Sequence, residues 1–216
     1  MVKKIYYRLR SLLSKPEERG EYSSGYWQDK VRSKALMLCK GIEGRILDVG
    51  CGEGLFLIRL AKENSALEVW GIDNSNERLH RAEEKAKGNT LGNIKFQYQE
   101  APHFNFPDDY FDAVVCINVL FNMRSLETVI ETLKQMKRIC KKEGRIIFDF
   151  RNGLNPLLKV KYGLAKYYDR TVKDLPLNTY TPDHIESIMK AIGLKITRSH
   201  AIGFFIKLCA PIVIIE

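Results

Sequence analysis

The feature that most constrains the fold is the stretch of residues 45–54, which reads Arg-Ile-Leu-Asp-Val-Gly-Cys-Gly-Glu-Gly. A short apolar run is typical of a buried β-strand, and the alternate glycines after it predict a tight turn. Glycine accepts a left-handed backbone and lets a ligand approach the main chain closely. The stretch therefore predicts a strand that delivers a small charged ligand to the start of a helix, as in a βαβ unit.

The glycine spacing limits the class of ligand. The turn reads G-x-G-x-G with Glu53 inside it, whereas a dinucleotide fingerprint reads G-x-G-x-x-G. A carboxylate there would repel a pyrophosphate but suits an amino group or a sulfonium. A second apolar run, residues 69–72, ends at Asp73, where a βαβ unit holds ribose hydroxyls. The two sites predict a nucleoside without phosphates and disfavour a nicotinamide-dependent oxidoreductase.

Four motifs in one order make the chain resemble the class I S-adenosylmethionine-dependent methyltransferases, in a small-molecule branch similar to type 11. Residues 46–54 match the first motif of that family, and residues 71–75 match its ribose-binding motif. Residues 106–112 match the stretch before its fourth strand, and residues 143–147 match the entry to its fifth. A single glycine turn would be a weak signal, but four ordered matches are specific.

Strands and helices are expected to alternate, which predicts an α/β fold with a parallel sheet covered on both faces. The resemblance implies a Rossmann-like, seven-stranded sheet of order 3-2-1-4-5-7-6, with an antiparallel seventh strand and ligands outside the carboxyl ends of the strands. Strands are expected at 45–49, 68–72, 94–98, 112–117, 144–150, 194–200 and 208–215. Helices are expected at 28–40, 54–65, 75–87, 125–141 and 182–192.

We expect a single domain over residues 1–216, because 216 residues with 45% hydrophobic composition can bury one good core and no linker or repeat divides the chain. Its parts are an N-terminal helical or lid segment (1–44), a cofactor-binding core (45–150), an insertion suited to covering the substrate (151–181), and a closing helix with a strand pair (182–216).

Several residues mark helix ends. Ser75 is expected to cap one helix and Gly88 to stop it. Thr181 is expected to cap the last helix, which Pro182 begins and Gly193 stops.

The resemblance implies roles for residues at the ligand edge of the sheet. The glycine turn would hold the methionine part of S-adenosylmethionine, the acid after the second strand its ribose, and the loop after the third strand its adenine. A residue under the reactive methyl group and a lid residue would complete the site, which S-adenosylhomocysteine leaves as product. The implied cofactor residues are Asp48, Gly50, Cys51, Gly52, Gly54, Asp73, Asn74, Glu100, Ala101, Asn118 and Tyr26.

Structural roles remain open for some of these positions. Asp48 could cap a strand end, Asp73 could be a solvent-facing turn residue, and Asn118 could be a capping asparagine. The aromatic side chains of Tyr22, Tyr26 and Trp27 could close over the cofactor, or simply pack against the sheet edge; only the first arrangement would exclude water from the methyl donor.

The acceptor side carries weaker signals. The sequence after the fourth strand lacks both the Asp/Asn-Pro-Pro-Tyr tetrad of amino methyltransferases and the Pro-Cys pair of cytosine carbon methyltransferases. A mostly apolar rim stands there instead, which suits a small or lipophilic acceptor, and methylation of oxygen is favoured. The expected acceptor-binding residues are Phe121, Asn122, Arg151 and Tyr162. No catalytic base is assigned, because no motif supports any of His103, His184, His200 and Asp149.

Charge is unevenly distributed: residues 1–45 carry +6, residues 46–150 carry −2 and residues 151–216 carry +5 of the net +9. Basic flanks favour an anionic substrate, an anionic membrane surface or nucleic acid, although a lysine-rich soluble surface explains them as simply. Residues 2–13 and 155–168 also mix apolar and basic side chains, as interfacial helices do. They could bring the enzyme to a membrane-associated acceptor, or be ordinary amphipathic cover helices.

The five cysteines are scattered, so neither a disulfide framework nor a zinc site is supported, and no metal is expected. Without a signal-peptide pattern or an apolar run of membrane-spanning length, we expect a cytoplasmic protein, with peripheral membrane contact as an alternative. The alternative functions are an RNA or protein methyltransferase, disfavoured because no RNA-binding module is recognisable, and a cofactor-binding protein without catalysis. The acceptor molecule and the oligomeric state do not follow from the sequence.

Overall fold

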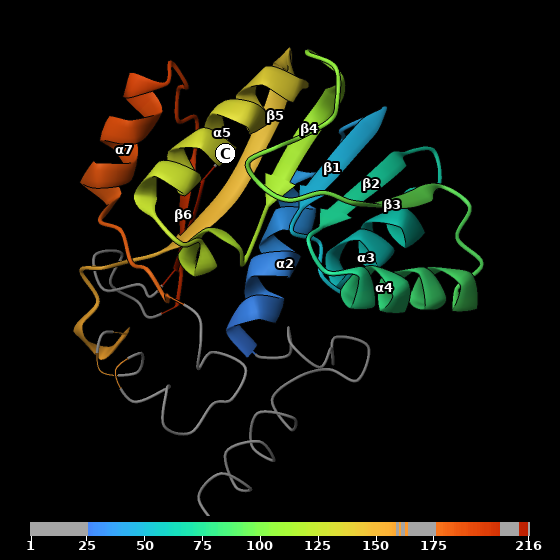
Figure 1. The fold of residues 1–216 in the computed structure, drawn as a ribbon, viewed down its shortest axis with the longest axis horizontal. Coiled ribbons are helices and arrows are strands. Elements are labelled where there is room, and N and C mark those ends of the chain that lie inside the picture. The colour runs from blue at the N-terminus through green and yellow to red at the C-terminus, as the bar shows by residue number, and fades with distance from the viewer. Residues whose placement is uncertain (1–25, 159, 161–162, 164–175, 204–211, 216) are drawn as a thin grey trace, which may run out of the picture.

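A computed structural model of the chain describes residues 26–158, 160, 163, 176–203 and 212–215. Its centre is a seven-stranded sheet flanked by helices (Figure 1). The strands are β1 (Arg45–Val49), β2 (Glu68–Asp73), β3 (Ile94–Tyr98), β4 (Phe111–Cys116), β5 (Cys140–Arg151), β6 (Ser199–Ile202) and β7 (Ile212–Ile215). The helices are α2 (Tyr26–Leu38), α3 (Leu55–Glu63), α4 (Asn76–Gly88), α5 (Leu126–Ile139) and α7 (Pro182–Ala191), with a 3-10 helix η2 (Leu120–Asn122).

The strand order is β3-β2-β1-β4-β5-β7-β6, which confirms the predicted topology. Strands β1 to β5 are parallel to one another, whereas β7 runs antiparallel to both β5 and β6. Because the carboxyl ends of parallel strands lie at one edge of a sheet, the loops that follow β1 to β5 gather there.

Alternate residues of the central strands enter two separate cores. Leu47 and Val114 belong to the core formed with α5 and α7, whereas Ile46 and Ala113 belong to the core beneath α2, α3 and α4. Both faces of the sheet are therefore covered, which explains why β1 and β4 are apolar at almost every position.

The predicted helix caps are confirmed. The side chains of Ser75 and Thr181 accept hydrogen bonds from the third residue of α4 and α7, respectively. Gly193 follows α7 with a left-handed φ of 70°. The N–H groups of Gly193 and Leu194 bond to the main-chain oxygens of Lys190 and Met189, which satisfies two acceptors of the last turn of α7. At α4, Gly88 is the last helical residue, but the left-handed position falls later, at Thr90, with φ 56°.

The sixth strand differs from its predicted bounds of 194–200. Leu194 and Ile196 do lie partly buried against the core, as an alternating pattern predicts. The ladder begins only at Ser199, which pairs with Ile215 of β7. Among the described residues, β7 offers nothing beyond Ile215 with which earlier residues could pair. The short helix η2 was not predicted.

Other expected features lie outside the described residues. These include the basic segment 2–13, the lid residue Tyr22, the acceptor residue Tyr162 and the start of the last predicted strand, 208–211. Tyr26 begins α2, but its side chain is also outside the description. Of the helices that are described, none could span a bilayer.

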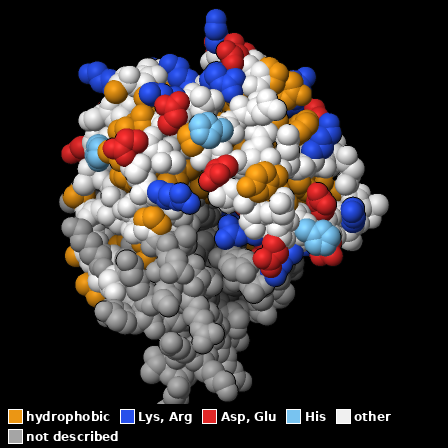
Figure 2. Space-filling model, in the orientation of Figure 1, with side chains coloured by type: hydrophobic (Ala, Val, Ile, Leu, Met, Phe, Trp, Pro, Cys, Tyr) orange, Lys and Arg blue, Asp and Glu red, His pale blue; other side chains and the backbone are white. Residues whose placement is uncertain are grey.

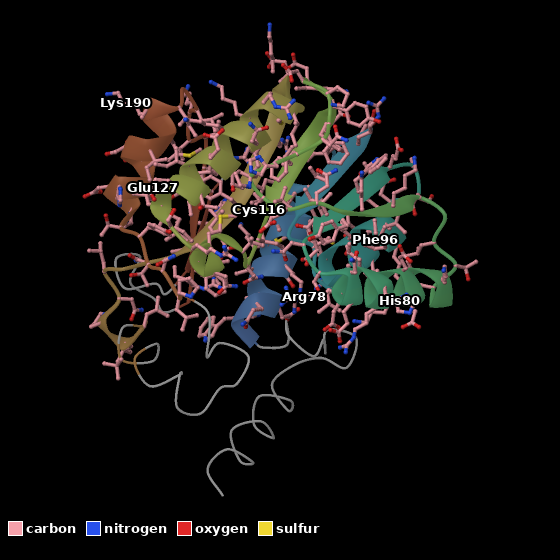
Figure 3. The ribbon with its side chains drawn as sticks, in the orientation of Figure 1. Arg78, His80, Phe96, Cys116, Glu127 and Lys190 are labelled. Carbon is pink, nitrogen blue, oxygen red and sulfur yellow. The ribbon has the colours of Figure 1, made fainter. Side chains whose placement is uncertain are left out.

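Gly71 lies where β2 packs tightly against side chains of α3, β3 and the glycine turn. A Cβ atom there would lie 2.6 Å from Leu57 Cδ1, 2.8 Å from Cys51 Sγ and 2.9 Å from Phe96 Cδ1. Phe96 projects from β3 (Figure 3). We expect Gly71→Ala to lower the free energy of unfolding by about 1–3 kcal/mol in urea denaturation, because overpacking displaces these neighbours. The control Gly92→Ala meets open space and should cost little; equal losses would contradict the packing argument.

Candidate active site

The site is built around the turn between β1 and α3. The N–H groups of Gly50 and Cys51 both donate to the Ile72 carbonyl oxygen, at 2.8 and 2.9 Å, which ties the turn to the end of β2. Gly50 has φ 73°, and Gly54, the N-cap of α3, has φ 74°. No side chain among the described residues caps α3 at Gly54, so its first N–H groups suit an anionic group of a ligand.

Val119, from the loop after β4, covers the turn on the other side. A Cβ atom at Gly50 would lie only 2.5 Å from Val119 Cγ2. The bare main chain of the turn therefore lies directly against this side chain, and any larger residue at Gly50 would push the two loops apart.

Asp73 ends β2 and lies across the glycine turn. Its Oδ2 accepts a hydrogen bond from Gly52 N at 2.9 Å, and its Oδ1 accepts one from Ser75 N at 3.0 Å. Arg78, on α4 (Figure 3), has a guanidinium nitrogen 3.9 Å from Oδ1. Burial raises the pKa of Asp73, opposed by the Gly52 N–H and by Arg78. Each oxygen of the Asp73 carboxylate can still accept a hydrogen bond from a ribose hydroxyl. Asn74, the next residue, is exposed.

Asp48 is buried in β1 with an unsatisfied oxygen. Its Oδ1 has no hydrogen-bond partner among the described residues. Burial raises the pKa of the Asp48 carboxyl well above its ordinary value, and repulsion from Asp73 adds to this, whereas Arg32 lowers it. A buried polar group left unpaired costs about 1–3 kcal/mol. The oxygen therefore suits a ligand that brings a cationic amino group to the turn.

Glu53, which the sequence predicts to be a repulsive charge inside the turn, is paired in the structure. Its carboxylate is buried, with Lys85 Nζ 2.5 Å from Oε2 and an Arg81 guanidinium nitrogen 4.0 Å from Oε1. Both cations come from α4, so the negative charge of Glu53 is neutralised locally. Glu53 therefore does not repel a pyrophosphate as an unpaired carboxylate would, and the glycine spacing alone disfavours a dinucleotide.

The loop after β3 is held beside β2. Gln99 N donates to the Asp73 main-chain oxygen at 3.2 Å, and Gln99 Oε1 accepts from Asn105 N at 2.9 Å. The loop carries an exposed Glu100 and a half-buried Ala101. These two residues, implied to contact adenine, thus lie next to the end of the strand that carries the ribose acid.

A buried charged cluster follows β4 and β5. Asn118 N donates to Asp149 Oδ1 at 2.5 Å, and Asn118 Oδ1 accepts from Arg151 Nη2 at 2.9 Å. Arg151 also donates to Asp149 Oδ2, and its Cζ lies 4.1 Å from the Phe121 ring centroid. Burial raises the pKa of Asp149, opposed by Arg151. The role of Arg151 in binding an acceptor stays a prediction, since its guanidinium already bonds to two side chains.

Sequence reasoning named these residues but missed the cluster. Asp149 and Arg151 are two positions apart on β5, so their side chains share a face of the strand. This spacing was the available signal that the two side chains could form a pair.

Residues 176–180 lie beside η2 and were not singled out in the sequence. Asn178 N donates to the Phe121 main-chain oxygen at 2.7 Å, and Asn178 Nδ2 donates to the Met123 main-chain oxygen at 2.6 Å. Tyr180 N donates to the Arg151 main-chain oxygen at 2.9 Å. The segment thus joins the loop after β4 to the end of β5, although no motif marks Asn178.

The candidate bases are scattered. His103 and His184 are exposed, and His200 lies on the edge strand β6. Asp149 is fully buried and already accepts hydrogen bonds at both oxygens. The described residues do not bring any of the four to an open position beside the glycine turn.

Comparison with known proteins decides the family, because residues 42–191 match the family described as methyltransferase domain. The chain belongs to this methyltransferase family. The match confirms the resemblance to class I S-adenosylmethionine-dependent methyltransferases. The unpaired oxygen of Asp48 and the acceptor capacity of Asp73 fit the amino group and ribose of that cofactor, respectively.

Two relatives show how the methyltransferase chain relates to characterised proteins. It is 31% identical over 150 residues to a phosphatidylethanolamine N-methyltransferase of Cereibacter sphaeroides, covering 68% of this chain and 71% of the relative. It is 36% identical over 122 residues to a demethylmenaquinone methyltransferase of Geobacillus kaustophilus (strain HTA426), covering 56% and 50%. The chain spans half or less of the length of several relatives that it matches.

A solved structure shares the fold of this methyltransferase chain. It is the magnesium protoporphyrin IX methyltransferase of Synechocystis PCC 6803 with bound S-adenosylhomocysteine, with a TM-score of 0.70 and 18% identity. The match covers 98% of this chain and 93% of the other.

The raised pKa values predict a pH effect on the protein without ligand. The pKa values of Asp48, Asp73 and Asp149 are raised on folding, so each group binds its proton more tightly in the folded than in the unfolded protein. Stability therefore falls as the pH rises from the unfolded carboxyl pKa of about 4 towards each folded pKa, by up to about 1.4 kcal/mol per pH unit for each group. The lowered pKa values of Glu68 and Asp112 act in the opposite direction, but only at more acid pH. Urea denaturation from pH 5 to 7.5 should show the fall.

The variant Asp48→Asn should show a shallower fall than the wild type, because one of the proton-retaining groups is gone. Asp183→Asn, at the exposed start of α7, is the matched control and should keep the wild-type slope. Identical slopes for the wild type and Asp48→Asn would contradict the assignment to Asp48.

Proposed function

We propose that the protein transfers the methyl group of S-adenosylmethionine to a small lipophilic acceptor. The observation that carries the proposal is the buried, unpaired oxygen of Asp48 next to a turn whose main chain Gly50 leaves bare. A carboxylate of this kind, and the first N–H groups of α3, which no side chain of the described residues caps, together suit the ammonium and carboxylate of an amino acid. Family membership supports the same donor.

The proposed roles follow the order of the strands. Asp48 and the turn 50–54 bind the methionine part, Asp73 and Asn74 bind the ribose, and the loop at residues 100–101 binds the adenine. When bound, the sulfonium of the donor supplies an electrophilic methyl carbon. The protein then has to hold the acceptor in line with that carbon, and such positioning can supply most of the rate acceleration.

A lipophilic acceptor is supported by the wall after β4. Phe121 and Met123 are buried there, and Asn122 Oδ1 is buried without a hydrogen-bond partner among the described residues. An apolar wall with one unsatisfied acceptor suits a mostly apolar molecule with a single polar group. The two relatives are named for a phospholipid and a quinone precursor, which supports this class. The preference for an oxygen atom rests on the sequence alone, and one relative is named for methylation of nitrogen.

The described residues do not offer a free base at the site, so we propose that the acceptor arrives as a competent nucleophile or loses its proton to water. Such a reaction needs orientation and exclusion of competing nucleophiles more than it needs proton transfer by the protein. The rate should therefore follow the ionisation of the acceptor.

The donor site can be tested without any acceptor. We expect the wild type to bind S-adenosylhomocysteine in isothermal calorimetry, and Gly50→Ala to weaken binding at least about tenfold, because the new methyl group would displace Val119. Gly41→Ala is the matched control: Gly41 has φ 76° but meets nothing within 4 Å, so only stability should suffer. Equal weakening by both variants would count against the assigned turn.

The acceptor class can be tested with radiolabelled donor methyl groups. We expect transfer to a demethylated quinol with a polyprenyl tail, kept reduced so that it is the nucleophile and releases its proton to water, and no transfer to transfer RNA. Labelling of RNA or of protein would favour the macromolecular alternative. Tight S-adenosylhomocysteine binding without transfer to any extracted metabolite would indicate a cofactor-binding protein without catalysis.

We also propose peripheral contact with membranes at the end of β5. Leu154, Leu157 and Val160 lie three residues apart and expose 45%, 65% and 60% of their surface. Over the face shown in Figure 2, basic and acidic side chains are interspersed, so the support comes from these apolar side chains. Leu157→Asp should reduce the fraction that sediments with anionic liposomes, whereas Met37→Asp, equally exposed on α2, should not. A wild type that stays in the supernatant would exclude the contact.

A further inference from the structure

Asn118, in the loop after β4, has an unusual main-chain conformation. Its φ is 61°, and the other non-glycine residues with positive φ in the described ranges, Thr90, Asp109 and Leu177, lie elsewhere in the chain. The left-handed region is disfavoured for residues with a Cβ atom, although asparagine enters it more readily than most. Something in the surrounding structure therefore has to hold the turn at Asn118.

The buried pair of Asp149 and Arg151 supplies that hold. Asp149 Oδ1 accepts the Asn118 N–H at 2.5 Å, and Arg151 donates to the Asn118 side-chain oxygen at 2.9 Å. Arg151 also donates to the second oxygen of Asp149, so the three residues form a closed triangle. Side-chain exposure is 5% for Arg151 and 0% for Asp149, which places this pair away from water, whereas Asn118 is half-buried.

The held turn sets the position of the residues that follow it. Val119 is next in the chain, and its Cγ2 atom would meet a Cβ at Gly50 at 2.5 Å. The ring of Phe121, in η2, lies against the Arg151 guanidinium, and its main-chain oxygen accepts a hydrogen bond from the Asn178 N–H. The cofactor turn and the acceptor wall thus depend on the same three-residue triangle.

We propose that Asn118 is a positioning residue whose left-handed turn, held by Asp149 and Arg151, sets Val119 against Gly50 and so fixes the wall of the donor site. The inference rests on the proposed function, because it assumes that this wall faces the methyl donor. It differs from the role implied by the family resemblance: the main-chain conformation of Asn118 matters here, and direct contact of its side chain with the cofactor is not required.

A pair of variants separates conformation from side chain. Asn118→Ala and Asn118→Gly both remove the hydrogen bond to Arg151 and both keep the N–H that donates to Asp149. Only alanine resists the left-handed region, so Asn118→Ala should weaken S-adenosylhomocysteine binding about fivefold or more in calorimetry. Asn118→Gly should stay within about twofold of the wild type. If Asn118 acted only through a contact of its side chain, Asn118→Gly would weaken S-adenosylhomocysteine binding as much as Asn118→Ala does.

Thr90 provides the matched control. It has φ 56°, is exposed and lies beyond α4, so Thr90→Ala and Thr90→Gly impose the same conformational difference away from the site. Their melting temperatures should differ, but their affinities for S-adenosylhomocysteine should equal that of the wild type. If Asn118→Ala does not fold, Val119→Ala decides the matter, because it keeps the turn and removes the methyl groups that face Gly50; it should weaken binding about threefold or more.

The outcomes distinguish the inference from the proposed function. The positioning role is overturned, with the donor assignment intact, if Asn118→Ala binds S-adenosylhomocysteine as well as the wild type, or if both Asn118 variants bind it equally weakly. If Asn118→Ala does not fold, unchanged binding by Val119→Ala overturns the role in the same way. A folded wild type that binds no S-adenosylhomocysteine would overturn the proposed function, and the inference would fall with it.

Discussion

The close packing of neighbouring side chains against the main chain at Gly50 and Gly71, permitted because these residues carry no side chain, is the constraint on which the rest of the structure depends. Gly50 lets the first turn lie against Val119, and Gly71 lets β2 lie against α3. The Ile72 carbonyl then accepts two N–H groups of the turn. Because hydrogen bonds of this length need close contact, side chains at either glycine would disturb the ligand edge and the core together.

The two buried carboxylates of the site differ in whether their oxygens have hydrogen-bond partners. Asp149 has both oxygens satisfied within the protein, and the charge of Arg151 lies beside it. Asp48 is equally buried, yet one of its oxygens lacks a partner among the described residues. Removing one member of a buried ion pair is strongly destabilising, whereas an unpaired group becomes more favourable when a ligand satisfies it. The first arrangement is suited to holding a shape, and the second to binding.

The sequence predicted what local patterns and motif order determine. The first strand, the caps at Ser75 and Thr181 and the order of the sheet follow from short-range signals and from resemblance to one family. The neutralisation of Glu53 by Lys85 could not be predicted, because it joins residues 32 positions apart through the packing of α4 against the turn. The start of β6 depends in the same way on its partner strand. Asn178 donates to the main-chain oxygens of Phe121 and Met123. Every residue type has such an oxygen, so the sequence could not indicate which residues Asn178 contacts.

The parallel bridge between Asn152 and Tyr180 has a consequence for how such enzymes diversify. Gly153 N donates to the Tyr180 oxygen and Tyr180 N donates to the Arg151 oxygen, so the chain leaves β5 and returns to it at nearly one point. Closing a loop between joined ends becomes only slowly more costly as its length grows. A change in the length of the chain between these two points can therefore be tolerated by the sheet, provided that the bridge and the contacts of Asn178 with Phe121 and Met123 are kept.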